Sequence, residues 1–246
     1  MTLVSAETRS EKAPPQSRNH LLARLPATEY AALRAELEPV RLAARRRLAE
    51  PGQPIDAVYF PHDAVISLSA RDERAAVEVG SIGCEGMAGL PVLLGTDSSN
   101  GLLHVQIAGD GERMELAAFR REVERQPVFR GLLLLYAQAF FAQLAQSTAC
   151  NRLHSAESRL ARWLLICRDR LGRDDLPITH EALAHMLGVR RATVTETAGD
   201  LQRQGMIRYR RGVVTIARRE RLEAVSCECY RIVREEFDRL LGVRVG

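Results

Sequence analysis

The sequence predicts an α+β protein with an N-terminal β-barrel or jelly roll, one long helix and a C-terminal winged helix-turn-helix. Three observations predict this fold. Short β-rich runs separated by turn residues fill residues 40–117. An apolar stretch with helical periodicity follows over residues 118–153. A helix-turn-helix pattern and a hairpin pattern then lie between Thr179 and Ile216.

Composition excludes several classes of protein. The chain has 246 residues, of which 46% are hydrophobic, so it can form a substantial core and is not a disordered chain. Five cysteines are too few and too scattered for a disulfide scaffold, which favours a reducing, cytoplasmic location. The most apolar stretch, Gly131–Ala145, is shorter than the roughly 20 residues of a membrane span, so we expect no membrane segment.

The N-terminal part of the chain is predicted to be a flexible arm over residues 1–18, followed by a sensor barrel over residues 19–125. Helical spacing runs from Leu21 to Leu37 and ends near Pro39. The strands that we expect in the barrel are Val58–Phe60, Val65–Ser69, Val77–Val79, His104–Ile107 and Arg113–Leu116.

A long helix is predicted over residues 126–154, and it is apolar on two faces. A helix of this kind needs two neighbours. We expect one face, with Leu133, Tyr136 and Phe140, to pack on the barrel. The other face is predicted to join two copies of the chain through Leu132, Leu135, Ala139 and Ala142. The alternative is an ordinary core helix.

The net charge of +4 is less informative than its distribution. Lys12 is the only lysine, so the abundance of arginine reflects the composition habit of the host. Between Arg190 and Arg221, however, nine arginines stand against three acidic residues. A local cluster of this kind favours a polyanion as partner, and the planar guanidinium suits phosphate well.

The segment from Thr179 to Leu201 has the pattern of a helix-turn-helix. It lies in a predicted domain of residues 155–225. A C-terminal helix is predicted after this domain, over residues 226–246. Thr179 can cap the first helix, and Gly188 can take the positive φ of the turn. The second helix would begin near Arg190 and present its first two turns to base edges and phosphates. The residues predicted to contact DNA there are Thr179, His180, Arg190, Arg191, Thr193, Thr195 and Glu196.

A hairpin is predicted directly after this helix, from Met206 to Ile216, with its turn near Arg211-Gly212. A hairpin in this position is a wing, whose arginines can contact the DNA backbone. Arg208, Arg210 and Arg211 complete the predicted DNA-binding set.

Together, the barrel, the long helix and the segment Leu183–Val194 resemble the cyclic-AMP receptor protein/FNR family of bacterial transcription regulators. The resemblance covers residues 20–225 and is most specific in the winged helix. It implies a cyclic-nucleotide-binding-like barrel, a homodimer joined by the long helix, a palindromic operator on double-stranded DNA and contact with RNA polymerase. Cyclic-AMP receptor protein docks its helix-turn-helix on DNA and bends the duplex.

The recognition helix departs from the family pattern at two positions. Arg191, Thr193 and Val194 match it, but Ala192 replaces a glutamate and Glu196 replaces an arginine. Arg191 can still bind guanine through two hydrogen bonds, whereas Ala192 cannot accept one from cytosine. We therefore expect an operator that differs from the consensus of the receptor protein.

The effector cassette of the family is degenerate here. Gly83, Glu85, Gly86 and Met87 match its start, but no Arg or Lys occurs from Met87 to Ile107 to neutralise a cyclic phosphate. We expect no cyclic nucleotide and no other cofactor, with a remodelled pocket for a cyclic nucleotide or small effector as the alternative.

Metal and redox chemistry have little support in the sequence. No cysteine precedes Cys84, which argues against the N-terminal iron–sulfur cluster of the FNR branch. Cys227 and Cys229 are too close together to form a zinc site alone and lack a second pair, so no metal site is expected. A thiol-based redox sensor or enzyme that uses Cys84 is the alternative from another class.

Enzyme motifs are missing from the sequence, and we assign no catalytic residue. His180 and His185 are five residues apart, about 140° around a helix, and cannot share a metal as the histidines of a metalloprotease do.

Overall fold

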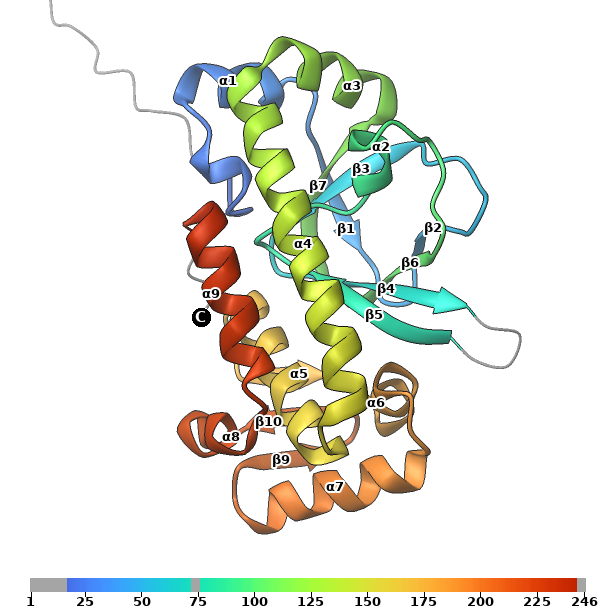
Figure 1. The fold of residues 1–246 in the computed structure, drawn as a ribbon, viewed down its shortest axis with the longest axis vertical. Coiled ribbons are helices and arrows are strands. Elements are labelled where there is room, and N and C mark those ends of the chain that lie inside the picture. The colour runs from blue at the N-terminus through green and yellow to red at the C-terminus, as the bar shows by residue number, and fades with distance from the viewer. Residues whose placement is uncertain (1–16, 72–75, 243–246) are drawn as a thin grey trace, which may run out of the picture.

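The computed structural model describes residues 17–71 and 76–242 (Figure 1). Residues 1–16 of the predicted arm lie outside the described residues. Its last two residues contact the sheet domain: Ser17 donates a hydrogen bond to Glu112, and Arg18 forms an ion pair with Asp63.

Two short helices precede the sheets, η1 (Leu22–Arg24) and α1 (Ala27–Arg34). The Asn19 side chain accepts hydrogen bonds from the backbone of Leu21 and Leu22, which starts the first turn. The helix ends at Arg34, earlier than predicted, and Pro39 lies in the first strand instead.

The strands of the N-terminal half form two antiparallel sheets. One sheet has the order β1-β7-β3 and the other β2-β6-β4-β5. Apolar side chains from both sheets share one core, which includes Phe60, Ile66 and Met114. The five predicted strands are confirmed within β3–β7, although Leu116 already begins a helix. The strands are β1 (Glu38–Leu42), β2 (Arg47–Ala49), β3 (Ala57–Pro61), β4 (Val65–Arg71), β5 (Ala76–Ile82), β6 (Leu102–Ile107) and β7 (Gly109–Glu115).

Three helices belong to this half of the molecule: α2 (Leu90–Leu93), α3 (Leu116–Arg125) and α4 (Pro127–Leu153). Pro127 opens α4, as suits the first position of a helix. The predicted long helix is therefore confirmed. Within the described residues α4 is long and apolar enough to cross a membrane by length and composition. It packs on β5 and on α9, however, in the manner of a core helix.

The C-terminal helix α9 (Cys229–Leu241) runs back along α4 toward the N-terminal helices (Figure 1). Its Val233, Phe237 and Leu241 are buried in the core that the two sheets share, and the ring of Phe237 meets the ring of Tyr136 edge to face. This helix therefore ties the end of the chain to the sheet domain.

The remaining elements surround a second core, which includes Trp163, Leu183 and Val214. Val65 and Ile107 of the sheet domain join this core, so the two halves are packed against each other. The elements are α5 (Ala156–Leu171), β8 (Asp175–Pro177), α6 (His180–Leu187), α7 (Arg191–Arg203), β9 (Ile207–Arg210), β10 (Val213–Ile216) and α8 (Arg219–Val225). The exact domain boundaries stay a prediction.

Candidate functional site

The helix-turn-helix forms as the sequence predicts. The Thr179 hydroxyl accepts a hydrogen bond from Ala182 N and so caps α6. Gly188 ends α6 with φ 64°, a backbone conformation that favours glycine. Val194 is buried between α6 and the rest of the domain. These local features fix the angle between α6 and α7.

Helix α7 presents the predicted polar residues on its first turns. Arg190, Arg191, Thr195 and Glu196 are exposed, and Thr193 is half-buried. The Thr195 hydroxyl donates a hydrogen bond to the Arg191 carbonyl, so it holds the helix as well as facing outward. Two exposed arginines, Arg190 at the N-cap and Arg191 in the first turn, therefore mark the N-terminal end of α7.

His180 connects the three parts of the DNA-binding domain. Its Nδ1 lies 3.1 Å from Thr195 Oγ1, and its ring stacks on Tyr209 of β9 with 4.0 Å between centroids. Burial and the nearby Arg191 lower the pKa of His180. A neutral imidazole donating from Nδ1 suits this site, because the Thr195 hydroxyl proton is already given to Arg191. His180 is half-buried and stacks on the wing, and its predicted contact with DNA stays a prediction.

The wing is confirmed as a hairpin of β9 and β10. Arg211 and Gly212 both have positive φ, as a two-residue hairpin turn of this twist requires. Side chains alternate along β9, so Tyr209 faces His180 while Arg208 and Arg210 are exposed on the opposite face. The wing thus adds Arg208, Arg210 and Arg211 to the arginines at the start of α7. Contact of any of these residues with DNA stays a prediction.

The cassette residues are buried inside the molecule, where Glu85 lines a small pocket. Gly83, Glu85, Gly86 and Met87 are all buried. The Tyr136 hydroxyl of α4 donates to the Met87 carbonyl, and a Cβ on Gly86 would lie 2.2 Å from the Tyr136 ring. A side chain on Gly83 would likewise collide with Arg170. These residues pack against their own chain. Their assignment to a degenerate effector cassette stays a prediction.

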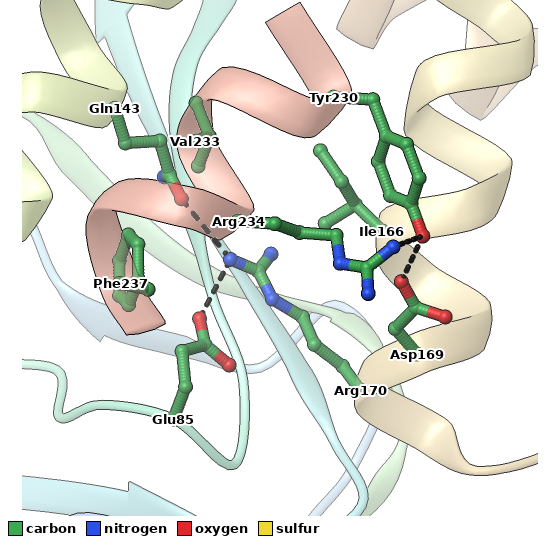
Figure 2. Close-up of a pocket in the computed structure, with 9 residues that line it drawn as sticks. All are labelled: Glu85, Gln143, Ile166, Asp169, Arg170, Tyr230, Val233, Arg234 and Phe237. Atoms are coloured by element: carbon green, nitrogen blue, oxygen red, sulfur yellow. Dashed lines mark hydrogen bonds and ion pairs between the residues drawn. The ribbon is translucent and has the colours of Figure 1, made fainter. Parts of the chain in front are cut away.

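Glu85 is held by an arginine from the DNA-binding half (Figure 2). Arg170 of α5 lies 2.6 Å from Glu85 Oε1 and also donates to Ser81 and to Gln143 of α4. The partner of the cassette glutamate is thus supplied from within, 85 positions further along the chain. Sequence spacing gave no signal for this network.

The same figure shows a second polar cluster beside the first. The Tyr230 hydroxyl of α9 donates a hydrogen bond to Asp169. Asp169 also accepts a hydrogen bond from Arg219 of α8. Neighbouring residues of α5 therefore point to two partners, Arg170 to the sheet domain and Asp169 to the C-terminal helices. Helix α5 is in this way the common link between the sheet domain, α8 and α9.

A cavity of about 670 Å³ lies between strands β4 and β5, helices α2 and α4 and the loop of residues 94–101. Its apolar wall includes Leu68, Leu90, Phe140 and Leu144, and its polar groups are mostly hydroxyls. None of the described residues that line it is charged. The polar lining is Ser69, Thr96, Ser98, Ser99 and Asn100.

One hydroxyl in this cavity has no partner among the described residues. Ser69 is 1% exposed, and its Oγ makes no hydrogen bond. A buried polar atom without a partner costs free energy unless a ligand or water satisfies it. The uncharged lining of the cavity, rather than this buried hydroxyl, is what suits an uncharged molecule.

The exposed face of α4 differs from the predicted dimer face. Ala139 is completely buried, and Leu132 and Ala142 are half-buried. Ala139 cannot contact a second copy, because it lies in the chain's own core. Leu134, Leu135 and Phe141 are 49%, 41% and 52% exposed and form the apolar part of the outward face.

Cysteines behave differently in two places. Burial raises the pKa of Cys84 to about 12, which disfavours the thiolate that redox chemistry needs. Cys227 and Cys229, by contrast, meet Cys150 and His154, and their ligand atoms all lie within 4.8 Å of one another. The missing second pair of ligands comes from the end of α4, a convergence that sequence spacing missed.

Comparisons with known proteins agree with this arrangement. Residues 158–225 match the family model of the Crp-like helix-turn-helix domain. The global nitrogen regulator of Nostoc sp. strain PCC 7120 is 27% identical over 179 residues, which cover 68% of this chain and 79% of that protein.

Two solved structures have a similar fold. FixK2 from Bradyrhizobium japonicum has a TM-score of 0.66 and 13% identity, with 78% of this chain and 98% of that chain covered. The c-di-GMP-responsive global regulator CLP from Xanthomonas campestris has a TM-score of 0.63 and 15% identity, with 78% and 99% covered. At these identities the likeness concerns the fold.

Proposed function

We propose that this chain, whose residues 158–225 match the Crp-like helix-turn-helix domain, is a Crp/Fnr-type transcription regulator that binds a palindromic DNA operator as a homodimer. The observation that carries the proposal is the set of exposed arginines on one domain. Arg190 and Arg191 begin α7, and Arg208, Arg210 and Arg211 lie on the adjacent wing. Base contacts from the helix and phosphate contacts from the wing are the expected division of labour.

The first turns of α7 define which bases are bound. Arg191 binds guanine through O6 and N7, and Ala192 contacts a thymine methyl group. Glu196 is exposed one turn further on and can accept from a cytosine amine. The operator therefore differs from the consensus of the cyclic-AMP receptor protein.

Dimerisation is proposed through the outward face of α4. Leu135 from the predicted dimer set and Leu134 and Phe141 from the structure provide its apolar contacts. A partner helix on this face would also lie over Phe141, which lines the neutral cavity. Dimerisation and effector binding would then share one surface.

The effector is proposed to be a small uncharged molecule rather than a cyclic nucleotide. The support is the lining of the 670 Å³ cavity, in which no described side chain carries the positive charge that a cyclic phosphate needs. Titration with cyclic AMP and cyclic GMP should give no heat and no thermal shift. We further propose that the protein acts in the cytoplasm, contacts RNA polymerase and has no catalytic role.

The DNA-binding proposal is tested on the full-length protein with Arg191→Ala. Genome-wide footprinting supplies the operator, and competition binding then compares operator with scrambled DNA. Because the homodimer loses one two-bond guanine contact in each half-site, each worth about 1–3 kcal/mol, operator binding should weaken at least about 30-fold. Arg239→Ala, an exposed arginine on α9 far from α7, is the matched control. Unchanged preference for the operator in Arg191→Ala would overturn the proposal.

A further inference from the structure

Four metal-ligating side chains meet where the long helix ends. Cys150 lies in the last turn of α4, and His154 is the residue directly after it. Cys227 lies between α8 and α9 and Cys229 begins α9, more than 70 residues further along the chain. Cys150 Sγ is 3.5 Å from Cys227 Sγ, and Cys229 Sγ is 3.5 Å from His154 Nδ1.

The distances suit one ion with four ligands. With a zinc–sulfur bond of about 2.3 Å, two sulfurs of a tetrahedral site lie about 3.8 Å apart. The four ligand atoms here are all within 4.8 Å of one another before any ion draws them in. An iron–sulfur cluster would need its ligands further apart, because they bind different iron atoms.

The chemistry of the donors selects the kind of metal. Three thiols and one imidazole are soft and borderline donors, a set typical of structural zinc, whereas magnesium and calcium prefer oxygen. The three cysteines are at most 7% exposed and form a small cluster of their own, apart from both apolar cores. Packing of these helices does not require three thiols and an imidazole to converge at one place.

The surroundings match those of a metal site as well. Nδ1 of His154 faces the sulfurs, while its Nε2 lies 4.0 Å from the Glu228 carboxylate. Metal-ligating histidines commonly have a carboxylate on the other ring nitrogen, which orients the ring. Gln146 Nε2 lies 3.0 Å from Cys229 Sγ and donates to it, as suits a sulfur that carries negative charge.

A disulfide between Cys150 and Cys227 is the competing interpretation. It would use two of the four groups and leave Cys229 and His154 without a role, although both point to the same place. It would also need an oxidant. One ion that binds all four groups explains the whole arrangement.

We propose that Cys150, His154, Cys227 and Cys229 bind one Zn²⁺ ion per chain. The ion would connect the α4–α5 junction to the start of α9, two points that the sequence places far apart. Because Ser155 caps α5 immediately after His154, the ion would fix the joint at which the DNA-binding domain leaves α4. This proposal is independent of the operator and the effector.

Metal binding is measured on the full chain, purified in reducing buffer and stripped with a chelator. Titration with Co²⁺ should saturate at one equivalent and give the visible absorption of a tetrahedral thiolate complex, which Zn²⁺ then removes. Competition with a chromophoric chelator gives the affinity. Cys227→Ser and Cys229→Ser should each weaken Zn²⁺ binding at least 100-fold, while Cys84→Ser, a buried cysteine far from the cluster, should bind as the parent chain does.

Glu228→Gln guards against a folding artefact, since its side chain is 68% exposed. Loss of an outer-shell partner should lower metal affinity about 10- to 100-fold while the far-ultraviolet spectrum stays unchanged. Zn²⁺ should also raise the melting temperature of the parent chain but not that of Cys227→Ser.

Three results would overturn the proposal. The first is no saturable binding at one equivalent, and the second is equal affinity in Cys229→Ser and Cys84→Ser. The third is a Cys150–Cys227 disulfide, found by thiol counting in the metal-free chain under reducing buffer.

Discussion

Glu85 and Arg170 form a buried ion pair that joins the sheet domain to the DNA-binding domain. The two charged groups lie 2.6 Å apart, and their side chains are 3% and 4% exposed. Removing one partner of a buried pair leaves the other charge without compensation. The pair is therefore the strongest polar connection that we find between the two halves.

Arg170→Met should destabilise the protein by about 3–5 kcal/mol, because it leaves the Glu85 carboxylate buried and unpaired. Combining it with Glu85→Leu removes both charges and should recover most of this loss. Urea unfolding measures the difference. Arg41→Met, in an exposed pair with Asp110, is the control and should change little. Equal effects of the two arginine substitutions would contradict the prediction.

Tyr209→Ala should weaken binding to all DNA sequences without changing which sequence is preferred. The ring of Tyr209 stacks on His180 and so holds the wing against α6, behind the exposed Arg208 and Arg210. Arg208→Ala should act in the same direction and lower the slope of log affinity against log salt by about two, because the dimer loses one phosphate contact from each wing. Fluorescence anisotropy at several salt concentrations measures both. A changed base preference in either variant would assign these residues to base contacts instead.

Glu78→Gln should remove a pH dependence of stability. Glu78 accepts a hydrogen bond from Trp163 of α5, and burial raises the pKa of Glu78 to about 7. Between its unfolded pKa of about 4.3 and 7, the unfolded chain releases this proton while the folded chain retains it. Stability from this group is therefore complete at low pH and lost as pH rises, by at most about 1.4 kcal/mol per unit.

The test is urea unfolding at pH 5 and pH 7.5. The advantage of Glu78→Gln over the parent chain should grow with pH across this range and level off above it. Glu115→Gln, an exposed carboxylate, should show no such trend. A constant difference between Glu78→Gln and the parent chain would refute the assigned pKa.

Phe141→Glu should convert the proposed dimer to a monomer. Phe141 is 52% exposed on the outward face of α4, where a charge would be desolvated on pairing. Sedimentation equilibrium gives the association constant. Ile232→Glu is the control, because Ile232 lies on α9 and is 37% exposed. If Ile232→Glu dissociates the dimer and Phe141→Glu does not, α9 rather than α4 forms the interface.

Local signals were sufficient for the helix-turn-helix, the wing and the long helix. Thr179 and Gly188 fix the two ends of α6, and Arg211-Gly212 fixes the turn of the wing, because caps and tight turns depend on a few neighbouring residues. The apolar periodicity of residues 126–154 likewise predicted α4. The Ala139 prediction was wrong because periodicity shows that a face is apolar but not what covers it.

Residue patterns alone predict the order of the two halves, the helix-turn-helix with its arginines and the lack of an arginine where a cyclic phosphate would need one. The partner of the cassette, the cover of α4 and the meeting of the cysteines are seen only in the folded chain. Arg170 reaches Glu85, α9 returns along α4, and Cys227 meets Cys150 across 77 positions of sequence. These contacts depend on how whole helices pack, and no local rule of spacing encodes them.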